Sequence, residues 1–312
     1  MSRLPITKTP KVYVGGAFIR SESARVFPLK DAAGVFFANI PQCTRKDLRN
    51  AVEAAAKAGP GWARRTAYNR GQILYRLGEM LEARTDEMAE ALTIGTATSL
   101  SPSKRSSFTR ASANRPGGRG SKTKAAAVRE VSTAVDRLIH YAGWADKYEQ
   151  VLGSVNPVAA PYFNFTVTEP MGVVGVIAPD APPLLALVSL IAPAIVSGNT
   201  VVALASEKVP YPAILLGEML ATSDLPGGVV NLLTGFRKEL VPTFATHTHL
   251  RALSAAVTAA ERRTLELGAA ESVKRTHFAD AEQTDWFADS AQSLYAIRDF
   301  LEFKTTWHPV GA

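Results

Sequence analysis

The pattern of apolar positions predicts buried strands and helices in the second half of the chain. Residues 173–178 form an apolar, β-branched run, which suits a strand buried on both faces of a parallel sheet. An apolar helix is predicted over residues 184–196, and Gly198 and Asn199 after it are natural left-handed caps. A second buried strand is predicted at residues 200–204. This order predicts a strand–helix–strand crossover of a nucleotide-binding sheet.

Strands and helices continue to alternate as far as residue 279. Further helices are predicted at 211–222, 237–245 and 256–271, and further strands at 229–233, 250–254 and 274–279. Helical spacing and the N-cap residue Thr44 predict earlier helices from Thr44 to about Lys57, over 66–92 and over 124–150. A hairpin is predicted at 153–168, a last helix at 289–300 and a closing strand at 302–307. The predicted class is α/β, with a Rossmann-like parallel sheet, N-terminal helices, a β-hairpin arm and a C-terminal tail strand.

Several motifs, in this order, resemble the aldehyde dehydrogenase superfamily. Residues 169–179 (EPMGVVGVIAP) with 198–202 (GNTVV) carry the strongest resemblance, and residues 225–235 (LPGGVVNLLTG) are similar to the third strand of the family's cofactor domain. Residues 13–19 (YVGGAFI) resemble its opening hairpin, and residues 141–147 (YAGWADK) resemble the segment before its oligomerisation hairpin.

The resemblance implies a division into parts. Residues 1–279 are expected to form the N-terminal and cofactor-type domain, including the hairpin at 153–168, and residues 280–312 a C-terminal helix and tail strand. The tail resembles a family strand that pairs with a neighbouring subunit. The family's catalytic domain, which carries a cysteine nucleophile, is expected to be absent from these residues.

Composition limits the cellular compartments in which the protein is expected. The chain has 312 residues, 46% of them hydrophobic, and a single cysteine, Cys43, which excludes an internal disulfide and fits a reducing compartment. The first residues have no apolar signal-peptide core, and the longest apolar run, at 182–196, is too short to cross a membrane. A cytoplasmic protein is therefore expected.

The net charge of +7 originates in one segment. Seven basic residues and no acidic residue lie within residues 92–124. Residues 95–124 are rich in Ser, Thr, Gly and Arg, so we expect a disordered or loosely held insert there. Because Phe108 is the only aromatic residue of the insert, nucleic-acid binding is not expected, although a contact with a polyanion or a partner stays open.

No catalytic residue is predicted by the resemblance. Cys43 lies far upstream of the family's nucleophile position. Asp180 and Ala181 stand where the family has its oxyanion-binding asparagine, and Ala279 stands at the position of the general base. Glu266 lies in a similar LELG motif but about ten residues too early, which favours a helix-surface carboxylate over a displaced base.

The resemblance implies a vestigial cofactor site. Candidate residues at the ends of three predicted strands (173–178, 200–204 and 229–233) and just after them are Ile177, Ala178, Pro179, Ser206, Glu207 and Gly235. Leu204 replaces the family lysine that binds the adenosine ribose, and residues 254–256 (SAA) replace a glycine-containing turn at the pyrophosphate. Each lost contact costs about 1–3 kcal/mol, so either no NAD(P) binding or weak binding is expected.

The histidines do not predict a metal site. His247, His249, His277 and His308 are accompanied by no cysteine, and a surface or loop role is the simpler interpretation. The leading hypothesis is a non-catalytic subunit, structural or regulatory, in a homo-oligomer or in a hetero-oligomer with a full-length aldehyde dehydrogenase. NAD(P)-dependent aldehyde oxidation in complex with such a relative, and a weak nucleotide-binding module, are the alternatives.

Overall fold

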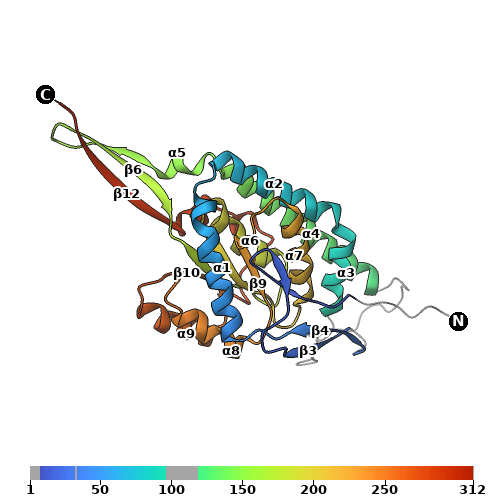
Figure 1. Ribbon diagram of the computed structural model, residues 1–312. Coiled ribbons are helices and arrows are strands. Elements are labelled where there is room, and N and C mark those ends of the chain that lie inside the picture. The colour runs from blue at the N-terminus through green and yellow to red at the C-terminus, as the bar shows by residue number, and fades with distance from the viewer. Residues whose placement is uncertain (1–7, 32–33, 96–118, 312) are drawn as a thin grey trace, which may run out of the picture.

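The computed structural model describes residues 8–31, 34–95 and 119–311. A seven-stranded sheet, in the order β11-β10-β7-β8-β9-β1-β2, forms the centre of the molecule (Figure 1). Its first five strands are mutually parallel, which confirms the predicted α/β class. The strands of this sheet are β1 (Val12–Val14), β2 (Ala17–Ile19), β7 (Val173–Ile177), β8 (Thr200–Leu204), β9 (Val230–Leu233), β10 (Leu250–Val257) and β11 (Arg275–Asp280).

Helices cover both faces of this sheet. One face packs against α1 (Arg45–Ala63), α8 (Arg237–Thr246) and α9 (Ala259–Ala270). The other face packs against α6 (Leu185–Val196) and α7 (Tyr211–Thr222). Outside α6 lie α2 (Ala67–Ala83), α3 (Thr85–Gly95) and α4 (Arg119–Trp144). Because α6 lies between the sheet and these outer helices, all its residues are buried, as its apolar sequence predicts.

Three strands form an arm that projects from the body (Figure 1). A short helix, α5 (Tyr148–Leu152), leads into a three-stranded sheet in the order β12-β6-β5. The strands are β5 (Ser154–Asn156), β6 (Tyr162–Pro170) and β12 (Leu301–Pro309). The predicted hairpin and closing strand are thus confirmed. β12 pairs along the whole of β6 in its own chain, and its other edge has no strand partner within the described residues, so its pairing with a neighbouring subunit stays a prediction. The short β5 covers only one edge of β6, and β12 completes the other.

Several predicted helices have different boundaries. The helix predicted over 66–92 is two helices, α2 and α3, because the chain turns at Arg84. The helix predicted over 289–300 shrinks to a 3-10 turn, η1 (Asp289–Ala291), and α10 (Leu294–Arg298). A further hairpin, β3 (Val26–Lys30) with β4 (Phe36–Pro41), was not predicted.

Most of the predicted insert falls outside the described residues. The structure describes the segment 95–124 only at its two ends, since residues 96–118 lie outside it. Residues 119–124 form the start of α4, so the helix predicted from 124 begins earlier and ends at Trp144.

Asn199 joins the sheet to the root of the arm. Gly198, with φ +94°, ends α6 as predicted. Asn199 contributes its side chain instead: its oxygen accepts from Gly172 N at 2.9 Å, and its nitrogen donates to Ser197 Oγ and to Phe300 O, both at 2.8 Å. The side chain is fully buried, so the Gly172 N–H and the Phe300 carbonyl depend on it for a partner, whereas Ser197 Oγ also donates to Ala194 O.

Replacing Asn199 tests this junction. We expect Asn199→Ala to lower the free energy of unfolding by about 2–4 kcal/mol, because buried N–H and C=O groups lose their partners. Urea denaturation of the full chain measures it. The control is Asn50→Ala, whose exposed side chain makes one long hydrogen bond to Glu22, and which should change stability by less than about 0.5 kcal/mol. Equal losses in the two variants would contradict the proposed role.

Candidate functional site

The candidate cofactor residues meet at one edge of the parallel sheet. Because β7, β8 and β9 are parallel neighbours, their carboxyl ends lie side by side. Ala178 N donates to Leu204 O at 3.0 Å, which keeps the segment after β7 against the end of β8. The structure thereby brings the six candidates into one region, which comprises Ile177, Ala178, Pro179, Ser206, Glu207 and Gly235.

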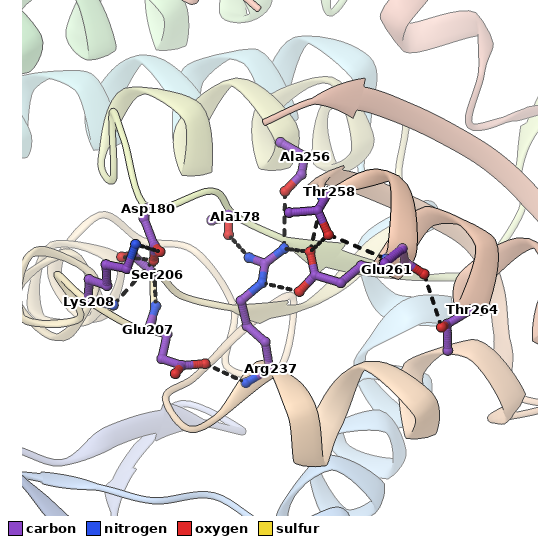
Figure 2. Close-up of polar contacts among 11 residues, drawn as sticks. Ala178, Asp180, Ser206, Glu207, Lys208, Arg237, Ala256, Thr258, Glu261 and Thr264 are labelled. Carbon is purple, nitrogen blue, oxygen red and sulfur yellow. Dashed lines mark hydrogen bonds and ion pairs between the residues drawn. The ribbon is translucent and has the colours of Figure 1, made fainter. Parts of the chain in front are cut away.

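Asp180 binds the turn that follows β8. One of its oxygens accepts from Ser206 Oγ at 2.9 Å and from the backbone N–H groups of Glu207 and Lys208 at 3.1 and 3.2 Å. The other oxygen forms an ion pair with Lys208 Nζ at 3.2 Å. Two backbone donors at this sheet edge are therefore satisfied by the chain itself (Figure 2). This role of Asp180 was not predicted.

Arg237 spans the ends of β7 and β10. It is the first residue of α8, and its guanidinium donates Nη1–H to Ala178 O at 2.6 Å and Nη2–H to Ala256 O at 3.2 Å. The same guanidinium binds both oxygens of Glu261, at 2.7 and 3.0 Å. The Arg237 and Glu261 side chains are only 13% and 23% exposed. Figure 2 shows the guanidinium surrounded by these acceptors.

Glu207 also takes part in this network. Its Oε2 accepts from the backbone N–H of Arg237 at 2.8 Å, so one carboxylate oxygen of this candidate cofactor residue already caps α8. Gly235, two residues earlier, has φ +151°, and a Cβ there would lie 3.1 Å from Cys43 O. The glycine is therefore explained by a close approach of the backbone, whether or not a ligand binds.

Glu261 stabilises the start of α9. It accepts from Thr258 N at 3.0 Å as part of a capping box. Burial alone would raise the pKa of Glu261, but the hydrogen bonds from Arg237 and Thr258 outweigh burial and lower it. The N-terminus of α9, a position suited to an anion, is thus occupied by a carboxylate of the chain.

Arg237 and Glu261 were missed by the sequence reasoning, although Ala178 and Glu207, which also contact Arg237, were among the candidates. A positive charge at the first position of a helix opposes the helix dipole, so Arg237 is an unfavourable choice for an isolated α8. That conflict was the one available signal that the side chain has a tertiary partner.

The dismissed catalytic candidates occupy unsuitable places. Cys43 is fully buried, and burial raises the pKa of its thiol to about 12, so the reactive thiolate is not populated near neutral pH. Glu266 lies on the exposed side of α9, where it accepts from Arg262 Nε at 2.8 Å. Ala181 precedes a cis peptide bond to Pro182, and Ala279 lies in β11.

The histidines are dispersed. His247 and His249 contact each other in the loop before β10, whereas His277 Nδ1 lies 2.8 Å from Asp299 Oδ2. Within the described residues, no group of three or more His, Cys, Asp or Glu side chains could hold a metal ion. In the same part of the chain, no helix has the length and apolar character needed to cross a bilayer.

Comparisons with known proteins identify the family. The aldehyde dehydrogenase family model matches residues 18–114 and 118–279. The chain is 33% identical to retinal dehydrogenase 2 of Gallus gallus over 244 residues. This aligned stretch covers 77% of this chain and 42% of that protein. It is 28% identical over 282 residues to the mitochondrial aldehyde dehydrogenase of Rattus norvegicus, covering 83% of this chain and 49% of that one. The chain belongs to the aldehyde dehydrogenase family.

Solved structures agree in fold. An NAD+ complex of aldehyde dehydrogenase from Bacillus cereus matches with a TM-score of 0.74 and 23% identity, over 87% of this chain and 50% of that chain. Aldehyde dehydrogenase from Brucella melitensis biovar abortus 2308 matches with a TM-score of 0.75 and 23% identity, over 86% and 51%. The chain thus spans about half the length of the relatives it matches.

The Arg237–Glu261 pair should make stability depend on pH. Because the folded-state pKa of Glu261 is lowered, the pair stabilises the fold above the unfolded pKa of a glutamate and loses this effect as the pH falls through the folded value. We expect Arg237→Met to cost about 1–2 kcal/mol at pH 7, allowing for partial solvent screening. The difference in free energy of unfolding between Arg237→Met and the unmodified chain should become smaller below about pH 4.

Urea denaturation at pH 7 and at lower pH measures this difference. The matched control is Arg262→Met, which removes the exposed partner of Glu266 on the same helix and should cost less than about 0.5 kcal/mol at either pH. If Arg237→Met loses the same free energy of unfolding at both pH values, the charge of Glu261 does not contribute to stability.

Proposed function

We propose that this chain is a non-catalytic member of the aldehyde dehydrogenase family that serves as a structural or regulatory subunit of an oligomer. The observation that carries the proposal is the occupation of the sheet edge by Arg237. Dinucleotides bind where parallel strands end, with the pyrophosphate at a helix N-terminus. Here Arg237 bonds to Ala178 and Ala256 at the strand ends, and Glu261 occupies the N-terminus of α9.

A dinucleotide would have to displace these contacts. Separating Arg237 from Glu261 leaves two partly buried charges without a partner, which costs far more than breaking an exposed ion pair. The negative charge of Glu261 would also repel a pyrophosphate. Together with the apolar Leu204, where the family places a ribose-binding lysine, this supports weak NAD(P) binding or none.

The chemistry of the only cysteine supports the same conclusion. Aldehyde oxidation by this family needs a thiolate, and the 312-residue chain offers only Cys43. That thiol is buried and strongly disfavours ionisation. An aldehyde could reach it only by local unfolding around α1.

The arm supports an assembly role. In the register of β6 with β12, Phe303 and Trp307 point to one face of the arm, and Phe163 and Val167 point to the other. These four side chains are between 41% and 58% exposed. Apolar side chains on both faces of a projecting sheet are typical of a surface that packs against another chain. A second copy of this chain, or a full-length relative with the same arm, fits that surface.

The cofactor and activity prediction is tested directly. We expect calorimetry to give dissociation constants for NAD and NADP of about 1 mM or weaker. Incubation with a panel of aldehydes should produce no NAD(P)H above a blank without protein, and Cys43→Ser should behave identically. A low-micromolar dissociation constant, or turnover that the mutation abolishes, would contradict the non-catalytic role. Turnover only after mixing with a full-length relative would favour the oxidoreductase alternative.

The assembly prediction concerns the arm. Sedimentation at micromolar concentration should reveal an oligomer, and Phe163→Lys with Trp307→Lys should shift it toward monomer, because each lysine places a charge in an apolar contact. The control is Tyr75→Lys, an equally exposed aromatic on α2, which should leave the distribution unchanged. A monodisperse monomer for the unmodified chain, both alone and mixed with a full-length relative, would refute the assembly role.

A further inference from the structure

A small cavity lies between the sheet and the segment that leads to the arm, and its lining includes Ala279, which stands at the family's general-base position. Its volume is about 250 Å³. Its walls come from α6, from β10 and β11, and from residues 284–300. Leu190, Pro193 and Phe300 supply apolar surface. A cavity of this size admits a molecule of several heavy atoms.

Three polar side chains that line the cavity have no hydrogen-bond partner. Ser189 Oγ, Ser254 Oγ and Trp286 Nε1 are buried and unpaired, although the three residues are only 5%, 1% and 5% exposed. Native proteins rarely leave such groups unpaired, because burial without a hydrogen bond is costly. Three of them around one cavity indicate an occupant with hydrogen-bond acceptors.

Arg137 does not line the cavity itself, but it carries a positive charge in contact with Trp286, which does. Its guanidinium donates Nη2–H to Trp286 O at 2.8 Å, but Nε and Nη1 are buried without partners. Arg137 is 2% exposed, and no carboxylate of the described residues lies within ion-pair distance of it. The carboxylates of Asp289 and Asp136 act on Arg137 only from beyond ion-pair distance, so an anion in the cavity would add to their compensation of its buried charge.

The remaining charged groups of the wall are already paired. His277 and Asp299 both line the cavity, and His277 Nδ1 lies 2.8 Å from Asp299 Oδ2. Both are partly exposed, at 42% and 28% of their side chains, so they lie where the cavity approaches solvent. The hydrogen bond from His277 lowers the pKa of Asp299 and keeps its negative charge engaged.

We propose that this cavity binds a small aliphatic carboxylate. Ser189, Ser254 and Trp286 supply the donors for the carboxylate oxygens, and Arg137 supplies the compensating charge. The apolar wall formed by Leu190, Pro193 and Phe300 accommodates a chain of a few carbons. None of the six candidate cofactor residues lines this cavity, although Ser254 and Ala279 do, and the proposal does not depend on the non-catalytic role proposed above.

Saturation-transfer NMR with the full chain and butanoate tests the proposal. We expect a dissociation constant of about 1 mM or tighter. Butanamide, which has the same shape without the charge, should bind about tenfold more weakly. Ser254→Ala and Trp286→Phe should each weaken butanoate binding by about tenfold. Arg137→Met should remove the preference for butanoate over butanamide.

The matched control is Ser223→Ala. Ser223 is also fully buried, but its Oγ already donates to Leu220 O and it does not line the cavity. This variant should bind butanoate like the unmodified chain, and near-UV circular dichroism checks that each variant is folded. Ser254→Ala removes only an unpaired hydroxyl, so it keeps the test usable if Arg137→Met fails to fold.

Three results would overturn the proposal. The first is no saturation transfer from butanoate at about 20 mM, roughly twentyfold above the expected constant, which would mean that water alone fills the cavity. The second is equal binding of butanoate and butanamide, which would exclude the carboxylate. The third is equal weakening in Ser223→Ala and Ser254→Ala, which would place the bound butanoate elsewhere.

Discussion

Backbone groups at the carboxyl edge of a parallel sheet must find partners, and in this protein charged side chains of the chain itself supply them. The Arg237 guanidinium donates hydrogen bonds to one carbonyl group after β7 and one in β10, and the Asp180 carboxylate accepts hydrogen bonds from two N–H groups after β8. In nucleotide-binding sheets the same edge is where a ligand enters. Its polar groups are satisfied here before any ligand arrives, so the order of this region rests on internal ion pairs.

These internal contacts also change how the resemblance to dehydrogenases is understood. Glu207 and Gly235 keep the residue types of the family motif, yet each has a local structural role. Glu207 caps α8, and Gly235 allows the backbone to pass close to Cys43. Retained residues at this edge therefore do not require a retained cofactor.

The sequence predicted the sheet well because burial on both faces leaves an unbroken apolar run, as in β7 and β8. The family resemblance implied Ala178 and Glu207 as cofactor residues, and the structure places both at the carboxyl edge of the parallel sheet. The sequence did not predict the turn at Arg84, since the apolar spacing of α2 continues into α3. The sequence also did not predict the Arg237–Glu261 pair, because these residues are 24 positions apart and meet only through the packing of α8 against α9. Side-chain hydrogen bonds of this kind leave no periodic signal.

The arm has a consequence for the order in which the protein folds. The hydroxyls of Thr166 and Thr305 lie 2.9 Å apart, although 139 positions separate them in the chain. Pairing across such a separation closes a very large loop, so it forms late and slowly compared with local contacts. During synthesis, β6 leaves the ribosome long before β12 and has one open edge meanwhile. A newly made chain can therefore meet the β12 of a neighbouring copy before its own, and exchange of that strand between copies is the misassembly to which this architecture is most exposed.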